Sequence, residues 1–339
     1  MLITRRHALT GLAAAPAIFS VSRGACAATT LKISHQFPGG TLEQGDFRDR
    51  LCRIFAKKVE EATKGDLKFE IYANSSLMKT LAQFSALRKG ALDMTFYPLA
   101  YAGGEIHETN ISLMPCLVTS YEQGMKWRDA EVGKLLAKIL EAKGIKIISW
   151  VWQAGGVASR KTPIRVPDDV KGVKIRGGTP EMDRMLAACG GNVSTMPSNE
   201  MYIGMQTGSL DAAVSSSTSL ISFRLEELSK ALTTGRTGSF WFMLEPLLMS
   251  KEIFDSLKPA EQKAILDVGQ EMEAWGTKEA KKDDEDAAKV YGAKGATIID
   301  LTVDDLAKWR KISEESAWKD FAAKTSPAAE LLKLALKVS

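Results

Sequence analysis

Residues 174–178 of this 339-residue chain read Lys-Ile-Arg-Gly-Gly and follow the turn signal Lys171-Gly172. The β-branched residues of the segment 173–175 predict a short buried strand after that turn. The strand delivers Arg176 to its end, where the two glycines follow. Glycine lets a ligand come close to the backbone, and a guanidinium can give a carboxylate two parallel hydrogen bonds. The stretch therefore predicts a carboxylate-binding position at Arg176.

A turn and a helix follow this strand. Residues 197–202 predict a turn into a helix that carries Met201 and Met205 and stops at residues 206–208. An arginine at a strand end, followed by such a helix, resembles the solute-binding proteins of TRAP transporters, which feed organic acids to a membrane carrier. The resemblance covers residues 31 to about 319 and favours carboxylate binding by Arg176 over the ordinary alternative, a surface or interlobe salt bridge.

The first 27 residues have the pattern of an export signal. They hold Arg5-Arg6, an apolar run over residues 8–19 and the small-residue site Ala25-Cys26-Ala27. Because the apolar run is too short to cross a bilayer, we expect a removable signal peptide. The arginine pair fits the twin-arginine export route, while Ala8 leaves the general secretory route open. Cleavage after Ala27 would leave a periplasmic protein.

The composition is ordinary for a globular protein, with 45% hydrophobic and 25% charged residues. A chain of this length can hold two domains. Three of its 45 basic residues, Arg5, Arg6 and Arg23, lie in the predicted signal, which leaves 42 basic against 41 acidic residues. A nearly neutral chain without a basic stripe argues against nucleic-acid binding.

The sequence lacks the common motifs of catalysis and metal binding. The mature chain has two histidines, His35 and His107, and no HExxH, CxxC or clustered acidic spacing. It has no GxSxG elbow, Walker loop or GxGxxG motif. The serines at 215–217 are expected to line a site or cap the backbone, and Glu200 to cap a helix. We expect no metal, no cofactor and no enzymatic activity.

Three cysteines remain after the predicted cleavage: Cys52, Cys116 and Cys189. An odd number without CxxC spacing does not describe a disulfide framework. We expect small buried residues, with a single bridged pair left open as the alternative.

A repeated pattern predicts two similar α/β units. Residues 90–96 and 208–213 each run from a glycine at a helix end, through a small residue and Leu-Asp, into a strand. In the first unit the hydrophobic periodicity predicts strands at 31–35 and 67–72 and helices at 43–63 and around 81–88. The predicted fold class is α/β, with two Rossmann-like lobes, a ligand cleft between them and a periplasmic-binding-protein type II-like arrangement.

The chain is expected to cross between the lobes. A strand at 146–152 would pass from the first lobe into the second, so we predict a first lobe of residues 28–150 plus about 236–270 and a second of residues 151–235 plus part of 271–339. A helix at about 259–291, with proline in its first turn, resembles the family's long helix that spans both lobes. Its charged run at 281–286 is expected to be a solvated face.

The resemblance also implies which residues face the ligand. In the second lobe, besides Arg176, they are Asn199 and Ser216. In the first lobe they fall near His35, Gln36, Pro98 and Tyr101. Neighbouring aromatic residues are expected as walls of the site, although core packing would explain each one equally well: Phe96, Tyr97, Trp152 and Trp241.

One departure from the family's pattern bears on the ligand. Members that bind sialic acid or C4-dicarboxylates commonly carry a second arginine upstream, and here Gly156 stands at the matching position, with Arg160 out of register. Residues 211–213 read Asp-Ala-Ala in place of Asp-Gly and an acidic residue. One fixed cation favours a monocarboxylate with an apolar, keto or aromatic body over a dicarboxylate.

The mechanism that the resemblance implies is capture by closure. A carboxylate docks on Arg176, the lobes close, and the closed form is presented to a two-part membrane permease driven by an ion gradient. A monomer is the family's common state. Two alternatives stay open: a receptor for an ABC importer or a sensor kinase, and a periplasmic enzyme acting on an organic acid.

Overall fold

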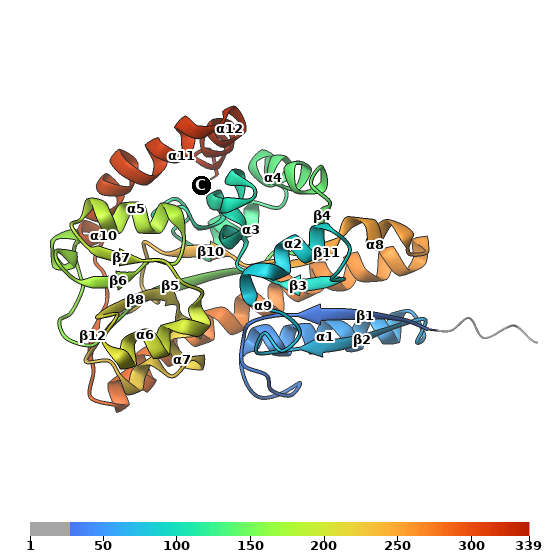
Figure 1. Ribbon diagram of the computed structural model, residues 1–339, viewed down its shortest axis with the longest axis horizontal. Coiled ribbons are helices and arrows are strands. Elements are labelled where there is room, and N and C mark those ends of the chain that lie inside the picture. The colour runs from blue at the N-terminus through green and yellow to red at the C-terminus, as the bar shows by residue number, and fades with distance from the viewer. Residues whose placement is uncertain (1–27, 339) are drawn as a thin grey trace, which may run out of the picture.

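Two β-sheets with helices packed around them form the molecule (Figure 1). A computed structural model describes residues 28–338, and the predicted signal peptide lies outside them. The first sheet has the order β2-β1-β3-β11-β4. Strands β1, β2 and β3 are parallel, whereas β11 runs antiparallel to both of its neighbours. The strands of this sheet are β1 (Thr29–Ser34), β2 (Leu67–Tyr72), β3 (Met94–Phe96), β4 (Ile145–Ser149) and β11 (Leu247–Ser250).

The second sheet has the order β12-β9-β5-β8-β6-β7, and β10 pairs with the start of β5. Strands β8, β6 and β7 are parallel, and β5 runs antiparallel to β8 and β9. Its strands are β5 (Trp152–Ser159), β6 (Lys174–Arg176), β7 (Asn192–Ser194), β8 (Ala212–Ser216), β9 (Ala231–Thr233), β10 (Phe242–Leu244) and β12 (Thr297–Ile299). The two sheets confirm the predicted two-lobe α/β fold.

Helices cover both sheets. Those in contact with the first sheet are α1 (Phe47–Ala62), α2 (Gln83–Arg88), α4 (Glu131–Glu141) and α8 (Lys251–Ser256). Those in contact with the second sheet are α3 (Tyr121–Lys126), α5 (Pro180–Ala188), α6 (Met201–Thr207) and α7 (Ser217–Ser222). The C-terminal helices α10 (Val303–Ser313), α11 (Lys319–Lys324) and α12 (Ser326–Ala335) run from α5 back to α4, so the chain end returns to the first lobe (Figure 1).

A side-chain cap fixes the first residue of helix α1. The prediction began this helix at residue 43, but it begins at Phe47, because the Asp46 side chain accepts a hydrogen bond from the Arg48 backbone N–H and caps it. Leu51, Phe55 and other apolar residues on one face are buried.

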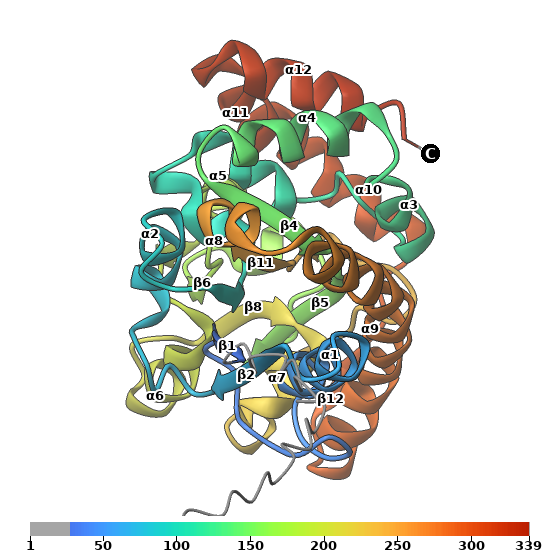
Figure 2. The same cartoon turned by 90° about the vertical axis from the view of Figure 1, so that its right-hand side faces the viewer.

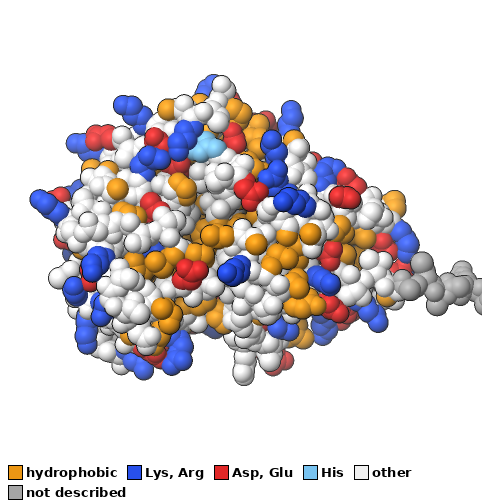
Figure 3. Space-filling view, viewed as in Figure 1, with side chains coloured by type: hydrophobic (Ala, Val, Ile, Leu, Met, Phe, Trp, Pro, Cys, Tyr) orange, Lys and Arg blue, Asp and Glu red, His pale blue; other side chains and the backbone are white. Residues whose placement is uncertain are grey.

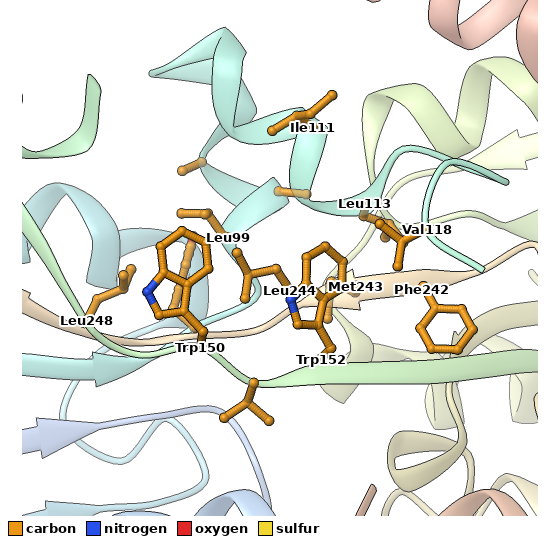
Figure 4. Packing of buried hydrophobic residues seen from close by; sticks show 14 of the residues in the cluster. Leu99, Ile111, Leu113, Val118, Trp150, Trp152, Phe242, Met243, Leu244 and Leu248 are labelled. Carbon is orange, nitrogen blue, oxygen red and sulfur yellow. The ribbon is translucent and has the colours of Figure 1, made fainter. Parts of the chain in front are cut away.

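The crossing between lobes lies at Trp150-Val151. The single strand predicted at 146–152 is two strands, β4 and β5, which belong to different sheets. The return crossing lies between β10 and β11, after Leu244 and therefore later than residue 236, where the sequence placed the return to the first lobe. Figure 4 shows Trp150, Trp152 and Met243 among the buried hydrophobic residues at these crossings.

Helix α9 (Pro259–Ala293) spans both lobes. At 1.5 Å per residue its 35 residues extend over about 50 Å. It contacts α1 and β4 of the first lobe and α7, β5, β9 and β12 of the second. Figure 2 shows it running along one side of the molecule past both sheets. Gly269 lets this helix lie directly on β4, because a Cβ there would be 2.3 Å from the Ile148 carbonyl oxygen.

The charged run in α9 is only partly solvated: the prediction is wrong for Asp284, and Asp283 is half-buried. Asp284 is buried and its Oδ2 accepts a hydrogen bond of 2.6 Å from the Tyr121 hydroxyl. Asp283 accepts one of 2.7 Å from the Thr218 hydroxyl. Burial raises the pKa of both carboxyls to about 6. The reason is helical periodicity: Asp284 lies on the same face as the buried Ala280 and Ala287.

The remaining surface is mixed in charge. Figure 3 shows basic and acidic side chains interspersed on one face, with hydrophobic side chains gathered across its centre.

Within residues 28–338, Cys52, Cys116 and Cys189 are free thiols. Among the helices of the same range, none is long and apolar enough to cross a membrane.

The contact at Gly269 gives a test of how the long helix is seated. We expect Gly269→Ala to lower the free energy of unfolding by about 1–3 kcal/mol, because the methyl group must push helix and strand apart. Gly292→Ala, on the same helix, is the control: its Cβ would meet nothing closer than 3.8 Å. It should stabilise by about 0.5–1 kcal/mol, through helix propensity. Chemical denaturation measures both, and equal effects would contradict this packing.

Candidate ligand-binding site

Arg176 ends strand β6 and is 2% exposed. Its Nε donates to the Met196 carbonyl at 3.0 Å and its Nη1 to the Val214 carbonyl at 2.6 Å. Its Nη2 donates to the Tyr101 hydroxyl at 2.7 Å. These bonds use three of the five N–H donors of a guanidinium, and they leave one on each Nη atom. The side chain is thus fixed in orientation with a pair of donors still available.

Arg176 forms no ion pair with any carboxylate in residues 28–338. Asp183 is the nearby acidic residue, but its oxygens accept hydrogen bonds from the Gly178 N–H and the Thr195 hydroxyl. Burial raises the pKa of Asp183, although the charge of Arg176 opposes that rise. A buried cation with unused donors is unfavourable unless an anion pairs with it.

A second buried arginine, Arg48, is fully neutralised. Its Nη2 lies 2.7 Å from Asp46 Oδ2 and its Nη1 lies 3.3 Å from Glu245 Oε2. Burial alone would lower the pKa of Arg48, but these two carboxylates outweigh burial and raise it above its usual range. Arg48 therefore differs from Arg176 in needing no further anion.

Two sets of hydrogen bonds join the lobes across the cleft. Tyr101, in the 3₁₀ helix η2 (Leu99–Gly104) after β3, accepts from Arg176 and, at 3.0 Å, from the Ser198 backbone N–H. Its own hydroxyl proton remains available. Arg48 Nη1 donates across the cleft to Ser219 Oγ at 3.0 Å and lies 3.4 Å from Ser216 Oγ. The contacting lobes therefore enclose the free donors of Arg176.

A cavity of about 10 Å³ lies at this junction. Three residues of its wall each carry a buried polar atom without a hydrogen-bond partner among residues 28–338: Thr179 Oγ1, Trp241 Nε1 and Glu245 Oε1. Together with Arg176 they surround the cavity with donors and acceptors that a polar ligand could satisfy. No cluster of three or more potential metal-ligating side chains occurs in the described part of the chain.

Several predicted site residues meet at this cavity. Arg176, Ser216, Tyr101 and Trp241 line it, as does Pro98. Ser216 also caps α7, since its Oγ accepts from the Ser219 N–H at 3.1 Å. Asn199 does not line the cavity: it is exposed in the 3₁₀ helix η5 (Ser198–Glu200), whose first residue, Ser198, faces inward in its place.

Five other predicted residues are buried outside the cavity wall. His35 is buried with its Nε2 3.2 Å from Asp49 Oδ1, and Gln36 is buried next to it in the loop after β1. The three aromatic residues among them pack against other rings, which is the core-packing alternative given for them above. Phe96 lies edge-on to Phe37, Tyr97 stacks on Phe84, and Trp152 lies edge-on to Trp127.

Sequence reasoning missed Arg48, Thr179, Ser198 and Glu245. Glu245 carried a usable signal, because it is the lone charged residue in the apolar run 240–249 and a buried charge needs a partner. No such signal distinguished Arg48, because it is one of several basic residues on an amphipathic helix.

Backbone packing explains the absence of a second arginine at Gly156. A Cβ at this position would be 1.8 Å from the Thr233 carbonyl oxygen. At the preceding Gly155, a Cβ would meet the Ser215 carbonyl at 2.1 Å and the Trp241 ring at 2.6 Å. The Trp241 ring therefore occupies the space beside β5 that a side chain would fill.

Two α/β lobes are joined by crossing strands and a long helix, and a buried guanidinium without a carboxylate partner in residues 28–338 lies between them. This is the architecture of a type II-like solute-binding protein. Residues 44–325 match the bacterial extracellular solute-binding protein family 7 (DctP). The chain belongs to this family, the solute-binding proteins of TRAP transporters.

Individual relatives agree with this assignment. A solute-binding protein of Albidiferax ferrireducens is 57% identical, covering 96% of each chain. A solved TRAP periplasmic solute-binding protein from Rhodoferax ferrireducens, with bound malonate, is 58% identical with a TM-score of 0.90, over 91% of this chain and 98% of that one. The 2,3-diketo-L-gulonate-binding periplasmic protein of Escherichia coli is 29% identical, over 84% of this chain and 87% of that protein.

Gly178 provides a test of how the guanidinium is seated. Its φ is +91°, and a Cβ would lie 2.2 Å from Arg176 Cζ. Gly178→Ala should therefore displace Arg176 and abolish binding of organic acids, besides costing about 1 kcal/mol or more of stability for the left-handed backbone.

The matched control is Gly172→Ala, because Gly172 has φ +74° and open space around its Cβ position. Gly172→Ala should lose stability only through its left-handed backbone conformation, and it should still bind organic acids. Denaturation curves and calorimetric titration separate the two effects. Unchanged acid binding in Gly178→Ala would contradict the site.

Proposed function

We propose that this protein is the periplasmic receptor of a TRAP transporter and captures an organic acid by a salt bridge from the ligand carboxylate to Arg176. The observation that carries the proposal is the buried guanidinium with two free N–H donors and no carboxylate partner in residues 28–338. A carboxylate is the group that matches two parallel donors in one plane. Tyr101 would add a third hydrogen bond from its hydroxyl.

Closure of the lobes would complete the site. Tyr101 comes from the first lobe and Arg176 from the second, so the hydrogen bond between them exists only when the lobes are in contact. A bound anion would offset the cost of burying Arg176 and so favour the closed form. We propose that this closed form is what the two-part permease recognises, after export to the periplasm and removal of the signal.

A monocarboxylate is the ligand class we favour. Within the described part of the chain, Arg176 is the one guanidinium that lines the cavity, Gly156 leaves no room for a second, and the carboxylate of Glu245 also lines the wall. The cavity volume of about 10 Å³ is room for about one water molecule, so the cavity must widen around a ligand, and a compact acid needs the least widening. The malonate in the Rhodoferax ferrireducens protein makes a short dicarboxylate the competing class.

The test is acid-induced stabilisation of the mature protein, with Arg176→Lys alongside. An acid at 100 times its dissociation constant should raise the unfolding free energy by about 2.7 kcal/mol. Lysine keeps the charge but loses the bidentate geometry, so Arg176→Lys should lose most of that gain. Denaturant unfolding with and without a library of mono- and dicarboxylates measures it.

Arg160→Lys is the control, because Arg160 lies in the same lobe, donates to the Leu210 carbonyl and does not line the cavity. It should respond to acids as the wild type does. An acid that stabilises the wild type and Arg176→Lys equally would refute the site. Recovery of a chemically altered ligand would favour an enzyme instead of a receptor.

A further inference from the structure

Glu245 stands out among the cavity residues because it is a buried carboxylate that the capture mechanism does not use. It lies between β10 and β11, where the chain crosses from the second lobe to the first, and it is 1% exposed. It lines the same cavity as Arg176, Thr179 and Trp241.

The two oxygens of Glu245 have different surroundings. Oε2 accepts from Gln153 Nε2 and lies 3.3 Å from Arg48 Nη1. Oε1 is buried and has no hydrogen-bond partner within the described residues. The partners of Oε2 hold the carboxylate plane in place, so Oε1 is the oxygen left for a ligand.

We infer that Glu245 Oε1 accepts a hydrogen bond from the second polar group of the ligand, so that the site selects compact carboxylates bearing a hydroxyl or N–H donor. This inference rests on the proposed function, because it needs the ligand's first carboxylate to lie on Arg176. It narrows the ligand class further than Arg176 alone does.

The selection follows from hydrogen-bond complementarity. A hydroxyl or N–H satisfies Oε1, whereas a keto oxygen or a second ionised carboxylate presents only acceptors to it. A buried acceptor facing another acceptor keeps its desolvation cost without a bond. A hydrogen bond to a charged group corresponds to a preference of roughly 10- to 100-fold over a ligand that lacks the donor.

A dicarboxylate would need a proton at this position. Burial raises the pKa of Glu245, against the opposing charge of Arg48, and Asp46 adds to the rise. Arg176 is the further charged group on the cavity wall. If malonate binds, Glu245 should therefore take up a proton, and malonate affinity should fall with rising pH even where both malonate carboxyls are ionised. The affinity of a hydroxy acid should stay level over the same range.

The experiment compares matched acid pairs by calorimetric titration. Each pair is a 2-hydroxy acid and its 2-oxo analogue with the same skeleton of three to five carbons, and malonate is added as the dicarboxylate. The wild type should bind the hydroxy acid of each pair roughly 10-fold or more tightly than the oxo acid.

Glu245→Gln should reverse this preference. The position of Oε2 receives donors from Gln153 and Arg48, so the amide oxygen of the new side chain must take that place. The amide nitrogen then occupies the place of Oε1 and offers a donor to the ligand. The variant should favour the oxo acid and malonate, with no pH dependence of malonate binding.

The control is Glu181→Gln, which replaces a fully buried carboxylate in α5 that contacts Asn110 and does not line the cavity. It should keep the wild-type preference. Equal binding of hydroxy and oxo acids by the wild type, or the same order of preference in Glu245→Gln, would overturn the inference while leaving the receptor proposal standing. Failure of every acid to bind, with Arg176→Lys indistinguishable from the wild type, would overturn both.

Discussion

The burial of Arg176 without a carboxylate partner in residues 28–338 is the constraint on which the site depends. The side chain is held by two backbone carbonyls of its own lobe and by the Tyr101 hydroxyl of the other. This arrangement satisfies part of the guanidinium and leaves a planar pair of donors. The left-handed Gly178 follows from the same constraint, since any side chain there would overlap the guanidinium. The fold thus keeps a cation ready for an anion from outside.

The two buried arginines, Arg48 and Arg176, differ in their carboxylate partners. Arg48 is neutralised by Asp46 and Glu245 and reaches the hydroxyls of α7, so it contributes to lobe contact without attracting a further anion. Arg176 has no carboxylate partner in residues 28–338, and in the proposed function its charge pairs with the ligand. Glu245 links the two, because one of its oxygens lies beside Arg48 and the residue also lines the cavity that Arg176 faces. One buried network therefore connects the contact between the lobes to the cavity wall.

The sequence predicted the fold class because apolar periodicity identifies the strands and helices. The glycines at 174–178 and the resemblance to TRAP solute-binding proteins pointed to Arg176, which ends strand β6 and lines the cavity. The residues of the cavity wall were harder to predict, because they depend on where the chain crosses between the lobes. Trp152 pairs with Trp127 in the core, and the cavity wall at β5 is filled by Trp241 from a segment far along the chain. A one-residue difference in a 3₁₀ turn places Ser198 rather than Asn199 inward.

A crystal structure of the mature protein with the acid that binds it most tightly would test carboxylate binding by Arg176 most directly. We expect both oxygens of one ligand carboxylate within about 3 Å of Arg176 Nη1 and Nη2, with the bond from Arg176 to Tyr101 retained. An acid bound elsewhere in the cleft, or Arg176 paired with a carboxylate of the protein itself, would contradict it.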